Sequence, residues 1–75
     1  MKFQPINSES GNILSAGYDS EEKRLVVNFQ GGKSYEYSGV PQNAWNAFSS
    51  TFDDKNKSTG SHFHKFIRSY PCKRL

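Results

Sequence analysis

The sequence contains little that would crosslink the chain or hold it in a membrane. Cys72 is its only cysteine, which excludes an internal disulfide and favours a reducing compartment. It has no run approaching the roughly 20 apolar residues of a membrane span, and its first residues lack the apolar stretch of a secretion signal. We therefore expect a cytoplasmic protein with no membrane contact and no disulfide partner.

The short length limits the hydrophobic core. A chain of 75 residues is one domain, and it buries only about 60–65% of the surface that its unfolded form exposes. Large rings compensate for this, because aromatic residues make up 15% of the sequence. We predict a single domain over residues 12–75, and we interpret residues 1–11 as a mobile arm or a weak edge strand.

Charge is distributed unevenly along the chain. Residues 1–54 carry four cations and seven carboxylates (net −3), whereas residues 55–75 carry six cations and no carboxylate (net +6). A basic final third suggests an anionic partner, although a solvated surface of a soluble protein is an equally good reading of the charge alone.

Alternating apolar residues predict three strands. The first is Asn12–Tyr18, in which Gly17 marks a bulge or a close backbone approach. The second is Arg24–Gln30, and the third begins at Lys33 and ends before Gly39 and Pro41. The three strands form an antiparallel meander, with a short edge strand at the C-terminus as an option.

The loop around Gly31 and Gly32 decides what the two tyrosines after it do. A two-residue loop pairs Tyr35 with Asn28 and leaves both rings exposed, as a stacking surface for RNA would require. A three-residue loop pairs Val27 with Tyr35 and places the rings with the apolar side chains. We predict the three-residue loop, because it gives the sheet one apolar and one polar face.

Two helices are expected after the strands, covering one face of the sheet. The first runs from Pro41 to about Ser50, and the second from Ser61, its expected N-cap, to about Tyr70, with a polar loop, residues 53–59, between them. Side chains expected to face the sheet are Ala44, Trp45, Phe48 and Phe52 from the first helix, and Phe63, Phe66, Ile67 and Tyr70 from the second. The fold class is α+β.

Three separated blocks of residues resemble the KTSC domain, a small family named for its occurrence at the C-terminus of some lysyl-tRNA synthetases. The blocks are Asn12-Ile-x-Ser-Ala-Gly-Tyr-Asp19, Tyr35-x-Tyr-x-Gly-Val-Pro41 and Ser58-x-Gly-x-x-Phe-x-x-x-Ile-Arg-x-x-Tyr70. His64 departs from the pattern, which often has asparagine there. The resemblance implies a small α+β domain, often an entire bacterial or bacteriophage protein, with a suggested role in RNA binding.

Catalysis and metal binding are not expected. A sheet with two short helices has little room for a pocket that holds two or three reactive groups within reach of one another. His62 and His64 point in different directions on a helix, and with the lone Cys72 they leave a metal without a fourth ligand. We expect a non-enzymatic domain without cofactor or metal, in which these histidines are solvated.

Nucleic-acid binding is the function that the residues favour, with RNA or another single strand as the partner. Cations would contact phosphates, and exposed rings would stack on bases. The expected contact residues are Lys55, Lys57, Lys65, Arg68, Lys73, Arg74, Tyr18, Tyr35, Tyr37 and Tyr70.

Two alternatives remain open at this point. The chain could bind a host or cellular protein through a free strand edge, at Asn12–Tyr18 or at the C-terminal tail. It could also bind a small nucleotide in a crevice beside residues 55–61, where Ser58, Gly60 and Ser61 would offer N–H groups to an anion at a helix start.

Overall fold

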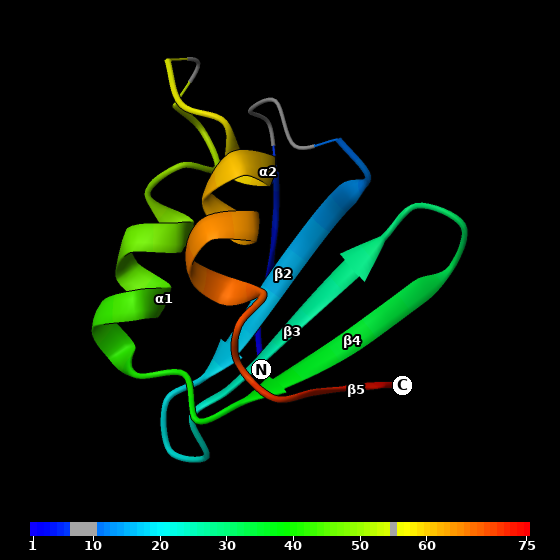
Figure 1. Cartoon of the computed structure of the whole chain (residues 1–75), viewed down its shortest axis with the longest axis vertical. Helices are drawn as coiled ribbons and strands as arrows, with labels where there is room; N and C mark the ends of the chain where they lie inside the picture. The colour runs from blue at the N-terminus through cyan, green and yellow to red at the C-terminus, as the bar shows by residue number, and fades with distance from the viewer. Residues whose placement is uncertain (7–10, 55) are drawn as a thin grey trace.

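A five-stranded antiparallel sheet forms one layer of the molecule, and helices form the other (Figure 1). The computed structural model describes residues 1–6, 11–54 and 56–75. The strands are β1 (Phe3–Pro5), β2 (Ile13–Asp19), β3 (Arg24–Phe29), β4 (Lys33–Ser38) and β5 (Cys72–Arg74), and they lie side by side in that order. Between β4 and β5 the chain builds α1 (Gln42–Ser49), α2 (Thr59–His62) and the π-helical turn η1 (Phe63–Ile67).

The α+β class is confirmed, but the sheet has five strands rather than three. The expected option of a C-terminal edge strand is realised by β5, which pairs with β4 and is extended by a hydrogen bond from the Leu75 N–H to the Ser34 carbonyl, at 2.8 Å. Of the two readings of residues 1–11, a mobile arm or a weak edge strand, β1 realises the second by pairing with β2 at the edge of the sheet. It contains Pro5, which a strand tolerates at the edge of a sheet, where one side of the backbone has no partner.

The three-residue loop between β3 and β4 is confirmed. Val27 pairs with Tyr35 and Phe29 with Lys33, so the tyrosines share the apolar face of β3 and the two-residue alternative is excluded. Gly31 and Gly32 have φ values of +85° and +77°, a left-handed conformation that favours glycine. The glycine pair thus fixes the loop that sets the register.

A bulge lies in β2, but not at the expected glycine. The register with β3 shifts between Ile13 and Ser15, so Ile13 and Ala16 are both buried although they are three residues apart, and Leu14 is turned outward. Gly17 has the other expected role, since a Cβ there would lie 3.0 Å from the Lys2 carbonyl oxygen.

Helix α1 covers the sheet with the expected apolar stripe. Trp45 and Phe48 are buried, as is Phe52 in the turn that follows the helix. Their rings meet edge to face, with centroids 5.7 Å apart for Trp45 and Phe52 and 5.0 Å for Phe48 and Phe52. Such pairs add to the free energy gained from burial alone, so this cluster is the centre of the core.

The second helix differs from the expectation in both its start and its winding. It begins at Thr59 and is capped by Ser58, whose hydroxyl accepts a hydrogen bond from the Ser61 N–H at 3.1 Å, so Ser61 is not the N-cap. It then widens into η1, which the Arg68 N–H closes on the Phe63 carbonyl at 2.9 Å. Phe66, expected to face the sheet, is 56% exposed. In a π-helical turn the hydrogen bond joins residues i and i+5, so the turn contains more residues than an α-helical turn. A residue three positions after a buried one is then rotated off the face that packs on the sheet.

Candidate nucleic-acid interface

The helix layer holds two of the expected phosphate contacts. Lys65 lies in η1 and Arg68 directly after it, and both are exposed. Lys57, in the loop before α2, is exposed as well, whereas Lys55 lies outside the residues that the structure describes. The positive charge of Arg68 opposes the rise of the pKa of Tyr37 that burial causes.

A buried pair of hydroxyls fixes where this layer begins. The hydroxyls of Thr51 and Thr59 lie 2.9 Å apart, and Thr59 Oγ1 also donates to the Thr51 carbonyl at 3.1 Å. Both threonines are buried, so these polar groups satisfy one another away from water. The contact ties the start of α2 to the end of α1 and thereby positions the cations of η1.

The tail cations are divided between the two faces of the sheet. In β5, Lys73 pairs with Glu36 and Arg74 with Tyr35. Because successive strand residues point to opposite faces, Arg74 lies on the face that carries the helices and Lys73 on the other. The structure therefore does not bring Lys73 together with Lys65 and Arg68.

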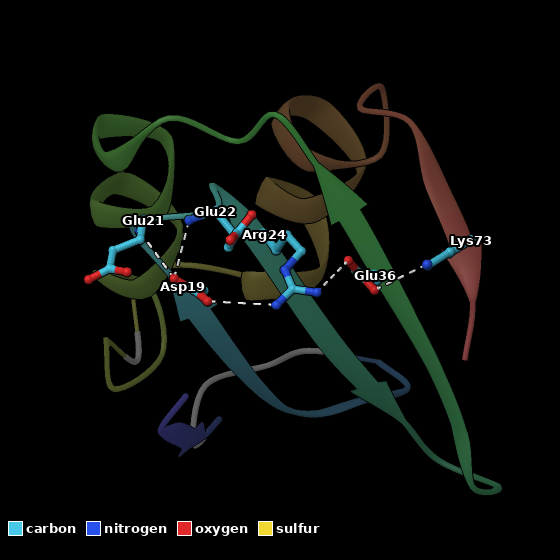
Figure 2. A network of polar contacts seen from close by, with 6 residues as sticks. All are labelled: Asp19, Glu21, Glu22, Arg24, Glu36 and Lys73. Carbon is cyan, nitrogen blue, oxygen red and sulfur yellow. Dashed lines mark hydrogen bonds and ion pairs between the residues drawn. The ribbon is translucent and has the colours of Figure 1, made fainter.

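Lys73 belongs instead to a charge network that crosses the helix-free face of the sheet (Figure 2). Its Nζ lies 3.8 Å from Oε2 of Glu36, a buried carboxylate, whose Oε1 lies 3.4 Å from Nη1 of Arg24. Nη2 of Arg24 lies 3.7 Å from Asp19, and Asp19 also accepts the backbone N–H groups of Glu21 and Glu22. Two cations therefore neutralise the negative charge of Glu36, and Lys73 pairs with this carboxylate of the protein itself.

Two of the four expected stacking tyrosines are structural. Tyr18 stacks on Trp45, with ring centroids 5.4 Å apart and planes 8° from parallel, and its hydroxyl donates to the Val40 carbonyl. Tyr37 is only 4% exposed, and burial, together with the nearby Cys72 and Tyr35, raises its pKa to about 12. Burial likewise raises the pKa of Tyr18. Tyr37 therefore offers no free face to a base, and Trp45 occupies one face of the Tyr18 ring.

Tyr35 and Tyr70 are only partly covered, and a further ring joins them. Phe29 is half-buried and meets Tyr35 edge to face, with ring centroids 5.7 Å apart. Its place at the end of β3, beside the hairpin loop, explains this exposure. Lys33 pairs with Phe29 and so shares its face. Sequence reasoning missed both residues, although the predicted register already placed them together.

The three residues expected to bind an anion do line a common groove. It has a volume of about 400 Å³ and lies between the start of α2 and the start of β2. One N–H of this helix start is already used, because the Ser61 N–H donates to the Ser58 hydroxyl. The residues that line the groove are Gly11, Asn12, Ile13, Phe29, Ser58, Gly60, Ser61, Phe63 and His64.

The two histidines differ in environment. His64 is exposed, but His62 packs on Phe48 and Phe66 at ring-centroid distances of 5.9 and 4.6 Å. The expectation that both are solvated is therefore wrong for His62, because the helix starts earlier and turns it inward. Among the described residues, no group of three histidine, cysteine or acidic side chains could hold a metal ion.

We expect stability to depend on the protonation of His62. Burial, and secondarily the charge of Lys57, lower its pKa, and its buried Nε2 has no hydrogen-bond partner among the described residues. The unfolded state then binds the proton more readily, so the free energy of unfolding should fall as the pH drops below the usual histidine value of about 6.5. Urea unfolding at about pH 7.5 and about pH 5 measures this. His62→Gln should weaken the dependence, and His64→Gln should preserve it. An unchanged dependence in His62→Gln would assign it to another group.

One of the two strand edges that the sequence predicts to be free is paired in the structure. Strand β2 is paired on both sides, so Asn12–Tyr18 cannot accept an additional strand. The sheet ends instead at β1 and β5, and the protein-binding alternative is left with those two edges.

Among the described residues, no helix has the length and apolar composition that a membrane span requires.

Comparisons with known proteins identify the fold. The profile of the KTSC domain matches residues 9–70. A KTSC domain protein from Yersinia pestis has a crystal structure that superposes with a TM-score of 0.81, at 33% identity over 99% of this chain and 96% of that chain. No curated protein matches the sequence. The profile match over most of the sequence, together with this structural neighbour, shows that the chain belongs to the KTSC domain family.

Proposed function

We propose that this KTSC domain is a non-enzymatic binding protein whose partner is RNA or another single-stranded nucleic acid. The observation that carries the proposal is a set of exposed cations on the helix side of the sheet. These helix-side cations are Lys33, Lys57, Lys65, Arg68 and Arg74.

The helix-side cations are available to an external anion. Among the described residues, the ion pairs of the chain involve Arg24 and Lys73, and none of the helix-side cations takes part in one. Glu36 and Asp19, which form those pairs, lie on the opposite face of the sheet, as the register shows. Cations without internal partners neutralise phosphates and release the counterions condensed on a nucleic acid.

Half-exposed rings beside these cations favour a single strand over a duplex. Phe29 and Tyr35 lie on the same face as Lys33 and Arg74. Unpaired bases can stack on aromatic side chains, whereas bases inside a duplex cannot be reached in that way. The proposal therefore assigns phosphate contacts to the cations and base contacts to these rings, and no longer to Tyr18 or Tyr37.

We expect the affinity for single-stranded RNA to fall steeply with salt. Each phosphate neutralised on a single strand contributes about 0.7 to the slope of log affinity against log salt concentration. If all of the helix-side cations make contact, the slope is about −3 to −4. Fluorescence anisotropy with a labelled single strand and a labelled hairpin, at about 50 and 200 mM salt, measures it. Absence of binding at the lower salt, or equal affinity at both, would contradict the proposal.

A further inference from the structure

The groove at the start of α2 has the size and lining of a binding site for a small flat group. Its volume of about 400 Å³ falls within the range of about 300–1,000 Å³ typical of ligand pockets. Three separate segments form it: the start of β2, the end of β3 and the chain from Ser58 to His64. One of these segments is itself anchored, since the Thr51–Thr59 contact holds the start of α2.

The inner wall of the groove is aromatic and apolar. Phe63 and Ile13 are buried core residues, and Phe29 is held between two rings, edge to face with Phe63 at 5.6 Å and with Tyr35 at 5.7 Å. Because Phe29 lines the groove and is only half-buried, part of its ring is open to an occupant. A ring fixed by its neighbours loses little conformational entropy when another ring packs against it.

The outer rim of the groove is polar. Asn12, Ser61 and His64 are exposed and line it, and their amide, hydroxyl and imidazole groups can donate and accept hydrogen bonds. An apolar wall with a polar rim matches a nucleobase, which has two apolar faces and a hydrogen-bonding edge.

Charge around the groove favours a base that is attached to phosphates. Lys33 lies opposite Phe29 on the same face of the sheet, Lys57 directly precedes Ser58, and Lys65 directly follows His64. None of the described residues that line the groove is acidic. Cations on the segments that form the pocket, with no acidic residue among its described lining, suit a nucleotide within a strand, with its base inside and its phosphates outside.

We infer that the groove holds one unstacked base of the single strand whose phosphates contact the helix-side cations. The inference rests on the proposed function, which it deepens. It assigns Phe29 as the stacking surface and Asn12, Ser61 and His64 as the groups that contact the edge of the base. Binding in this mode requires a base, whereas phosphate contacts alone form equally well with a chain that lacks bases.

A pair of ligands separates these two contributions. The first is a labelled hexamer of uridylate, and the second is the same ribose-phosphate chain without bases, which carries equal charge. Stacking contributes about 1–3 kcal/mol per base, or about 5- to 150-fold in affinity. We expect the protein to bind the uridylate hexamer at least about fivefold more tightly than the abasic chain at equal salt.

A variant that narrows the groove tests its location. Ser61→Leu adds apolar bulk at the rim and keeps the backbone N–H that caps the helix through Ser58. Ser69→Leu is the matched control, because Ser69 is exposed and lies outside the groove. We expect Ser61→Leu to lower the affinity for uridylate to that for the abasic chain, with the abasic affinity unchanged, and Ser69→Leu to change neither. Melting temperatures near that of the unsubstituted protein establish that both variants fold.

The outcomes distinguish the two levels of the proposal. Equal affinity of the unsubstituted protein for both ligands would overturn the base pocket and leave the phosphate contacts in place. A base preference that survives in Ser61→Leu would also overturn the groove as its site. Binding of neither ligand at low salt would remove the proposed function itself, and the base pocket with it.

Discussion

Replacing Trp45 with alanine is expected to remove a large part of the protein's free energy of unfolding. Trp45 is 8% exposed, stacks on Tyr18 and meets the edges of Phe48 and Phe52. Loss of a large buried ring destabilises proteins by about 3–5 kcal/mol, through lost burial and the cavity that remains. Domains have a free energy of unfolding of about 0.05–0.15 kcal/mol per residue, which is about 4–11 kcal/mol for 75 residues, so this loss is a large part of the total. Tyr18 also loses its stacking partner, which loosens the contact of β2 with α1.

Thermal and urea unfolding followed by circular dichroism measure this effect. The matched control is Phe66→Ala, which removes an aromatic ring that is 56% exposed. Because Phe66 contacts His62 but not the centre of the core, the control should lose less than about 1 kcal/mol. Near-normal melting of Trp45→Ala would mean that the aromatic cluster does not hold the helices on the sheet.

The sheet register was predictable because it follows from local geometry. Side chains alternate along a strand, so a choice between loops of two and three residues fixes the face of every residue in the hairpin. The apolar run of β3 and the tyrosines of β4 satisfy a single buried face only with the longer loop. The same register places Lys33 beside Phe29.

The formation of the two edge strands, expected only as options, and the winding of the second helix depended on information that a local sequence pattern does not carry. Strand β1 is three residues long and contains Pro5, so its formation depends on the edge that β2 offers rather than on its own propensity. The π-helical turn changes which residues face the sheet, and Phe66 was misplaced for that reason. Ser58 and Ser61 are equally good capping residues, and the buried contact of Thr59 with Thr51 distinguishes the two starts.

The candidate interface was predicted in composition but not in arrangement. The excess of cations in the final third is a property of the sequence, and Lys65 and Arg68 are exposed as expected. Lys73 and Arg74 lie on opposite faces of the sheet because β5 pairs with β4. A strand of only three residues is too short for this pairing to be predicted from its sequence. The groove arises where the start of β2 meets the start of α2, two segments more than 40 residues apart in the sequence.

Reversing two charges at η1 is expected to abolish most nucleic-acid binding. The double variant Lys65→Glu/Arg68→Glu replaces two exposed cations with carboxylates, so two attractions to phosphate become repulsions. The affinity for single-stranded RNA at about 50 mM salt should fall by at least about tenfold. The salt slope should become shallower by about 1.4, which is about 0.7 for each lost contact. Fluorescence anisotropy over a salt series provides both quantities.

The matched control for this variant is Lys2→Glu/Lys23→Glu, which changes the net charge by the same amount. Lys2 precedes β1, the edge strand at the other end of the sheet from β5, and Lys23 lies in the turn between β2 and β3, so neither belongs to the helix-side cations. If binding depends on the helix-side cations, the control should keep most of the affinity and nearly the full salt slope. Equal losses in the two variants would mean that overall charge, and not the surface at η1, attracts the nucleic acid. An undiminished affinity of the η1 variant would exclude Lys65 and Arg68 as phosphate contacts.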